Sequence, residues 1–184
     1  MLIRAMLFAL TLLPLPAAAQ DFEENEALLM RLTFDDCAGF VKDGIDPFDG
    51  LETEELSAEE KSVVEHIGKD VSATVIQNRT YFASWGTFAG IKICIIFRGF
   101  ERQDQQTSGI PLQRLLDQAD LRAEDLGLLI SPQDTDSGFV ERDWIEAGVD
   151  RRKALMVSMT LNVHQDVATI EGVTISMSLP PLLN

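Results

Sequence analysis

Two stretches near the end of the chain alternate apolar and polar side chains with a period of two. The first spans Ala154 to Val163, where leucine, valine and methionine alternate mainly with serine, threonine and asparagine, and the second spans Val173 to Leu179. Because successive side chains of a strand point to opposite faces, both stretches predict strands of a sheet with one buried and one polar face. Glu171 and Gly172 predict a tight turn from residues 167–170 into the last strand.

Three earlier stretches are rich in β-branched and aromatic residues, namely Val71 to Gln77, Thr80 to Trp85 and Ile91 to Arg98. Their composition predicts three more strands. In the third, alternate isoleucines point to one face while Cys94 points to the other. Both faces of this strand are therefore apolar, and we expect it to lie in the centre of the sheet.

Helical signals dominate the first part of the chain. Residues 25–41 repeat leucine and phenylalanine at helical spacing, which predicts an amphipathic helix that ends at Gly44. The spacing of Ser57 and Glu60 is that of a capping box and predicts the start of a second helix. A third helix is predicted to begin at Pro111.

Two polar regions separate these elements. Residues 101–108 are wholly polar and predict a loop, and a short helix is predicted around Arg122 to Leu128. Residues 131–150 contain proline, glycine and many acids, and predict a long surface excursion with a turn or short helix around Trp144. A chain of 184 residues fits one domain. The predicted fold is α+β, with N-terminal helices packed on a mostly antiparallel sheet.

The first 19 residues have the order of a secretory signal peptide. Arg4 supplies the positive charge of the n-region, the stretch from Ile3 to Leu13 is otherwise apolar except for Thr11, and small residues follow at Ala17 to Ala19. The run is shorter than the roughly 20 residues that span a bilayer. We expect cleavage after Ala19, which leaves residues 20–184 as one exported domain, periplasmic or secreted, without stable membrane insertion.

The chain has two cysteines, Cys37 and Cys94. Export to an oxidising compartment favours a disulfide between them. Neither lies in a Cys-x-x-Cys motif or beside a histidine, so their spacing argues against a metal site or a redox-active pair. We therefore expect a structural disulfide that holds the first helix against the face of the sheet that bears Cys94; two buried free thiols are the alternative.

The chain is strongly acidic, with a formal net charge of −15. Such a charge repels nucleic acids and anionic membranes at long range, and we expect neither as a partner. The acids are concentrated in residues 21–60. This region is either a face for a basic partner or for divalent cations, or a solvated surface that keeps the protein soluble.

Motifs of known enzyme chemistry are missing from the sequence, including a nucleophile elbow, a phosphate-binding loop and a zinc-protease helix. The two histidines, His66 and His164, have no sequence neighbours that suggest catalysis. Residues 134–138 resemble the start of a calcium loop but lack its later ligands. We assign no catalytic residue, no metal site and no cofactor.

The aromatic residues are the best binding candidates. Tyr81 and Trp85 are four residues apart and are predicted to lie on one face of a strand. Three interpretations are open: the two rings line a pocket, they form an exposed contact site, or they belong to the core. Trp144 is flanked by charged residues and is expected to be exposed, which makes it another candidate.

The function favoured by these observations is a non-enzymatic binding or interaction module of the cell envelope, with an unknown protein or small molecule as its partner. One alternative is an exported hydrolase whose catalytic residues are dispersed along the sequence. Another is an accessory envelope protein without a small-molecule site.

Overall fold

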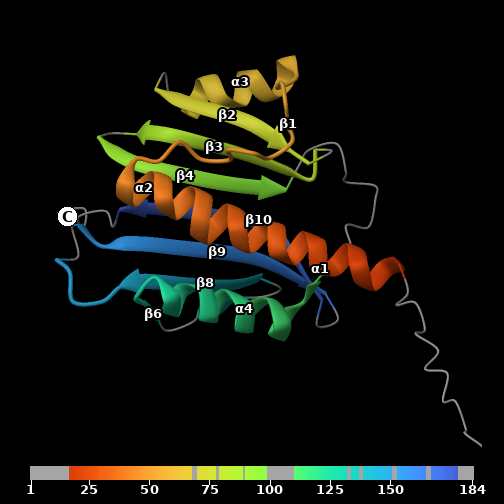
Figure 1. Cartoon of the computed structure of the whole chain (residues 1–184), viewed down its shortest axis with the longest axis vertical. Helices are drawn as coiled ribbons and strands as arrows, with labels where there is room; N and C mark the ends of the chain where they lie inside the picture. Colours follow the sequence, from red (N-terminus) through yellow and green to blue (C-terminus); the bar gives the residue numbers. More distant parts are fainter. Residues whose placement is uncertain are drawn as a thin grey trace, which may run out of the picture.

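The computed structural model describes residues 17–67, 70–77, 79–88, 90–98, 110–131, 134–136, 139–150, 153–164 and 167–177. In these residues a ten-stranded antiparallel sheet has helices over one of its faces (Figure 1). The predicted α+β fold, a single domain with N-terminal helices on an antiparallel sheet, is confirmed. No helix in the described ranges has the length and apolarity that a membrane span requires.

The strands follow one another in the order β1-β2-β3-β4-β10-β9-β8-β6, with β5 paired to β10 and β7 paired to β8. As predicted, the third of the early strands is central, because β4 lies between β3 and β10. The bounds are β1 (Thr53–Glu54), β2 (Val71–Ile76), β3 (Tyr81–Phe88), β4 (Ile91–Arg98), β5 (Ile110–Pro111), β6 (Leu128–Ile130), β7 (Asp134–Asp136), β8 (Phe139–Glu146), β9 (Leu155–His164) and β10 (Val167–Met177).

The N-terminal helical layer is one continuous helix in three parts: α1 (Ala17–Met30), the π-helical η1 (Arg31–Cys37) and α2 (Ala38–Asp43). It runs across the sheet in Figure 1, and its leucines and Phe34 enter the core. The helix ends as predicted at Gly44, which adopts a φ of 76° and donates its N–H to the Phe40 carbonyl at 2.9 Å.

The other two helices lie farther along the sheet. In α3 (Ala58–Ile67), beside β2, the capping box forms in both directions: the Ser57 N–H donates to Glu60 at 2.7 Å, and the Glu60 N–H donates to the Ser57 hydroxyl at 3.3 Å. The last helix, α4 (Leu112–Asp125), is unbroken. The short helix predicted at residues 122–128 is therefore wrong, because α4 continues through Arg122 and β6 begins at Leu128.

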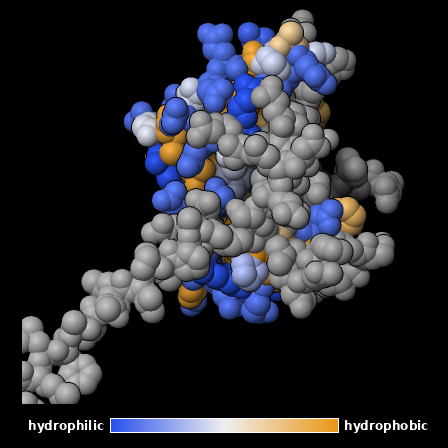
Figure 2. Space-filling model, turned by 90° about the vertical axis from the view of Figure 1, so that its right-hand side faces the viewer, coloured by the Kyte–Doolittle hydropathy of each residue, from blue (hydrophilic) through white to orange (hydrophobic). Residues whose placement is uncertain are grey.

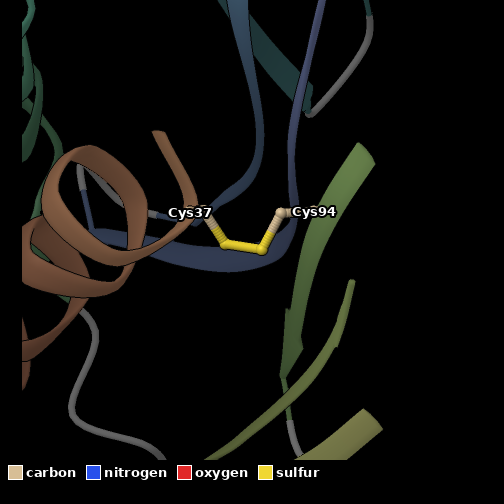
Figure 3. Close-up of a disulfide and its surroundings, with 2 residues drawn as sticks. All are labelled: Cys37 and Cys94. Carbon is tan, nitrogen blue, oxygen red and sulfur yellow. A yellow bond between two sulfur atoms is a disulfide. The ribbon is translucent and has the colours of Figure 1, made fainter. Parts of the chain in front are cut away.

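The predicted disulfide joins Cys37 at the end of η1 to Cys94 in β4 (Figure 3). Both residues are fully buried, and their Cα atoms are 5.5 Å apart. The bridge ties the helical layer to the centre of the sheet, on the face opposite the isoleucine stripe, as the alternation of β4 predicted.

The final strand differs from its prediction. Residues 167–177 form one strand, and the turn predicted at Glu171 and Gly172 is wrong. The register with β9 shifts between Ile170 and Gly172, which leaves Glu171 as an extra residue. Because β10 pairs with strands on both sides, the chain stays extended and the extra residue is absorbed as a bulge.

Residues 139–146 also differ from their prediction, since they form strand β8 and not a surface excursion. The side chains that alternate toward the helices are Val140, Arg142, Trp144 and Glu146. Arg142 bonds with Asp120, and Glu146 accepts a hydrogen bond from Lys42 at 3.0 Å. Because Arg142 and Glu146 are charged but lie on the covered face, β8 lacks the alternation of apolar and polar residues that predicts a strand.

Candidate functional site

The three aromatic candidates occupy different environments. Trp144 is fully buried and Tyr81 is 6% exposed, whereas Trp85 is only partly buried. The expectation that Trp144 is exposed is therefore wrong. Of these three side chains, Trp85 is the one with appreciable access to solvent, and a ligand contact at any of them stays a prediction.

Trp144 is an interior anchor between helix and sheet. Its indole N–H donates to Asp120 of α4 at 2.8 Å, and its ring meets Phe34 of η1 edge-on at 5.8 Å between centroids. Arg142 also binds Asp120. A buried indole N–H needs such a partner, and the flanking charges that suggested exposure are part of this network.

Tyr81 joins strand β3 to the first helix. Its hydroxyl donates to the Asn25 carbonyl of α1 at 3.5 Å, and burial raises the pKa of the phenol well above its usual value. The neutral form is thus the one present under ordinary conditions. Tyr81 lies on the same strand face as Trp85, as its spacing predicted, but Tyr81 is buried whereas Trp85 is only partly buried.

Trp85 borders an open hollow of about 560 Å³ on the helix-covered side of the sheet. The turn that follows α2 forms one wall, and β1, β2 and β3 form the other. The Phe48 ring packs edge-on against Trp85, with 5.2 Å between the centroids and 79° between the planes. The lining consists of Ile45, Asp46, Pro47, Phe48, Asp49, Thr53, Thr74 and Trp85.

The turn that bears Phe48 is held from the helix. Arg31 of η1 donates to the Asp49 carbonyl at 2.7 Å, and the Asp36 carboxylate accepts the N–H of Phe48. Phe48 has a φ of 69°, a conformation that only surrounding contacts keep favourable for a side chain of this size. These bonds hold the Phe48 ring edge-on against Trp85.

The buried setting of Asp36 also affects its ionisation. Burial raises the pKa of this carboxyl, while the charge of Arg31 and the N–H of Phe48 act in the opposite direction. Arg31 and Asp36 are 3.3 Å apart. Arg31 and Asp36 therefore bind each other and also hold the turn that bears Phe48 and Asp49.

The rim of the hollow is acidic. Asp46 and Asp49 are exposed, and the lining contains no basic residue. Nearby cations have other partners: Arg79 pairs with Glu60 at 2.5 Å and with Glu54 at 3.5 Å, and Lys92 lies 5.8 Å from the Phe40 ring centroid. Figure 2 shows another side of the molecule, where the described surface is mostly hydrophilic with scattered hydrophobic residues.

The lining of the hollow combines two aromatic rings, two carboxylates, two threonine hydroxyls and the apolar side chains of Ile45 and Pro47. Thr74 already donates to the Glu54 carbonyl at 3.3 Å.

The remaining polar candidates are only partly described. The backbone places His66 in α3 and His164 at the end of β9, and Asp134 to Asp136 form β7, but all of these side chains lie outside the described residues. Among the side chains that are described, no group of three or more acids, histidines or cysteines is arranged to hold a metal ion.

Sequence reasoning selected Trp85 but missed its partners. Phe48 lies in the segment Asp46-Pro-Phe-Asp-Gly50, whose composition indicates a turn but not what the turn packs against. Comparisons of this chain with protein-family models, with curated proteins and with solved structures find no match.

Proposed function

We propose that this protein is a non-enzymatic binding protein outside the cytoplasm, and that its hollow at Trp85 binds an organic cation. The ligand class is an alkylammonium group, free or as the lysine side chain of a partner protein. The observation that supports this most directly is the partly exposed Trp85 ring beside the exposed carboxylates of Asp46 and Asp49, with no base in the lining.

The physical basis is the complementarity of charge and surface. A cation over an indole face gains about 0.5–2 kcal/mol, and two nearby carboxylates add long-range attraction. The apolar stem of the ligand would cover Ile45, a side chain that is 61% exposed. A hollow of about 560 Å³ lies within the size range of small-ligand sites.

The surrounding charge supports the same ligand class. Residues 43–60 contain eight acids and no base: Asp43, Asp46, Asp49, Glu52, Glu54, Glu55, Glu59 and Glu60. A local excess of negative charge raises the concentration of cations near the site and speeds their encounter with it. We therefore infer that the acidic region at residues 21–60 is a face that attracts a basic partner.

A direct test is calorimetric titration with hexyltrimethylammonium, with hexanol as the neutral probe of similar length. We expect the cation to bind and hexanol to bind at least tenfold more weakly. Trp85→Ala should weaken cation binding at least tenfold, and Asp46→Asn with Asp49→Asn should weaken it several-fold and reduce its salt dependence.

Asp125→Asn is the matched control, because Asp125 is an exposed acid on α4 that lies outside both the hollow and the acidic segment 43–60, and its replacement removes one negative charge as each of the other substitutions does. It should leave the affinity unchanged. Equal binding of hexanol and the cation, or undiminished binding by a folded Trp85→Ala variant, would contradict the proposal.

Export is part of the same proposal. The disulfide is what an oxidising compartment permits, and the N-terminal sequence has the order of a signal peptide. The intact mass of the exported protein should correspond to residues 20–184, and thiol titration under denaturing conditions should find no free thiol. An uncut chain with two titratable thiols in the cytosol would contradict export.

A further inference from the structure

A second hollow, of about 480 Å³, lies at the other end of the sheet between α4 and β6. Its lining combines apolar side chains with three carboxylates: Asp117, Asp120, Leu121, Glu124, Leu128, Leu129 and Ile130. In the strand order it is separated from the Trp85 hollow by most of the sheet, since Trp85 is in β3 and β6 is the last strand. The proposed function makes no use of it.

Strand β6 is the edge of the described sheet. It pairs with β8 on one side, and within the described residues no strand pairs with its other side. The Ser131 N–H donates to the Asp143 carbonyl of β8 at 2.8 Å, and the Ala147 N–H donates to the Gly127 carbonyl at 3.3 Å. Because backbone groups of an antiparallel strand alternate in direction, the N–H and C=O groups of Leu128 and Ile130 point away from β8.

The side chains around this edge are unusually apolar for a surface. Leu121 is 56% exposed, Leu129 is 61% exposed and Ile130 is 50% exposed. Edge strands are commonly protected by charged side chains or proline within the strand, and Leu128–Ile130 contains neither. Outward backbone groups and exposed apolar side chains together are what an added strand requires.

The carboxylates define the chemistry of the added strand. Asp120 is engaged by Trp144 and Arg142. Asp117, which accepts a hydrogen bond from Gln113 at 2.7 Å, and Glu124 are exposed on α4, and the lining has no basic residue. A second copy of this chain would bring the same acids together, and each copy has a net charge of −15. Charge complementarity therefore favours a basic partner.

We propose that β6 and α4 form a docking site for an extended segment of a basic partner polypeptide, which adds to the sheet as a further strand. Ile130 lies on the same face as the buried Leu128, toward α4, and Leu129 lies on the opposite face. Basic side chains of the partner point toward α4 and its acids. Apolar side chains of the partner cover Leu129.

The test uses a seven-residue peptide that alternates lysine and valine, with binding measured by fluorescence anisotropy and by amide chemical shifts. We expect the amide signals of Leu128 and Ile130 to shift. If the peptide adds antiparallel, as every described pairing of this sheet is, the residues whose side chains face α4 also direct their N–H toward β6. N-methylation of the lysine amides should then abolish binding, whereas N-methylation of the valine amides should preserve it. A glutamate–valine peptide should not bind.

Variants of the protein give the reciprocal evidence. Ile130→Pro removes an N–H that points away from β8 and should weaken binding at least tenfold, while Ile130→Val should change it less than twofold. Asp117→Asn with Glu124→Gln should weaken binding several-fold. Glu141→Gln, an exposed acid outside the hollow, should leave the peptide-induced shifts of the Leu128 and Ile130 amides unchanged.

Several results would overturn the proposal. One is equal binding of the lysine-methylated and valine-methylated peptides to the wild-type protein, a comparison that stands even if Ile130→Pro fails to fold. Another is undiminished binding by a folded Ile130→Pro variant. A dimer in sedimentation that Ile130→Pro dissociates would identify a second copy as the occupant of this edge.

Discussion

Cys94 of β4 stands directly opposite Trp85 of β3, and both side chains lie on the face of the sheet that the first helix covers. The partner of Cys94 in the disulfide is Cys37, and the preceding residue, Asp36, accepts the N–H of Phe48. The disulfide therefore joins the helix that holds Phe48 to β4, the strand that pairs with the one bearing Trp85. It links the two walls of the candidate site through one intervening strand pair.

Replacing both cysteines by serine should lower the free energy of unfolding by about 4 kcal/mol, because the bridge closes a loop with a sequence separation of 57. Urea unfolding followed by circular dichroism measures the difference. A reductant should lower wild-type stability to that of the variant and leave the variant unchanged. A difference of less than about 1 kcal/mol would show that helix packing alone holds η1 on the sheet.

Asp120→Ala should destabilise the fold by about 1–3 kcal/mol, because it leaves the buried Trp144 N–H without its acceptor and Arg142 without its carboxylate. Thermal unfolding compares it with Asp117→Ala, an exposed residue on the same helix. The control should shift stability by no more than about 0.5 kcal/mol. Equal effects of the two substitutions would mean that the Trp144 hydrogen bond contributes nothing specific.

Glu60 makes the fold sensitive to acid. Its burial raises the pKa of the carboxyl, but hydrogen bonds from Ser57 and Arg79 outweigh burial, and the net pKa is below the usual 4.5. Its stabilising contribution is therefore complete above the unfolded pKa and is lost as the pH falls through the folded pKa. The stability deficit of Glu60→Gln relative to wild type should shrink as the pH falls from 7 to 2, measured by urea unfolding; a constant deficit would contradict the pKa shift.

Asp36 should have the opposite pH dependence. Burial raises its pKa above the usual 3.8, so the folded state binds the proton more tightly than the unfolded state does. The cost of the buried charge is present above the folded pKa and disappears as the pH falls below the unfolded value. The stability of Asp36→Asn minus that of wild type should therefore decrease on acidification in the same urea series, with a slope opposite in sign to that of Glu60→Gln.

Several elements were predictable because their signals are local. The capping box of Ser57 and Glu60 needs only residues three apart, and the alternation of β4 needs only its own eight residues. The same is true of the helix over residues 25–41. Short-range hydrogen bonds and periodic burial act within such windows, so their outcome can be expected before the rest of the chain is placed.

Other features have no local signal. Trp144 can be buried because Asp120 of α4 accepts its indole N–H. The charges of Arg142 and Glu146 in β8 are matched by Asp120 of α4 and Lys42 of α2. A chain segment does not reveal which distant side chains will neutralise it. The extra residue Glu171 is likewise absorbed into β10 only because neighbouring strands keep the chain extended on both sides.

By itself the sequence determined the α+β class, the starts of α3 and α4, the central position of β4 and the pairing of Cys37 with Cys94, whereas the first helix begins at Ala17 and not at residue 25. Only the tertiary structure decided which aromatic residue meets solvent, and that Phe48 and Trp85 share one hollow. The physical reason is range. Periodicity and capping act over a few residues, whereas burial and charge pairing depend on contacts that only the folded chain brings together.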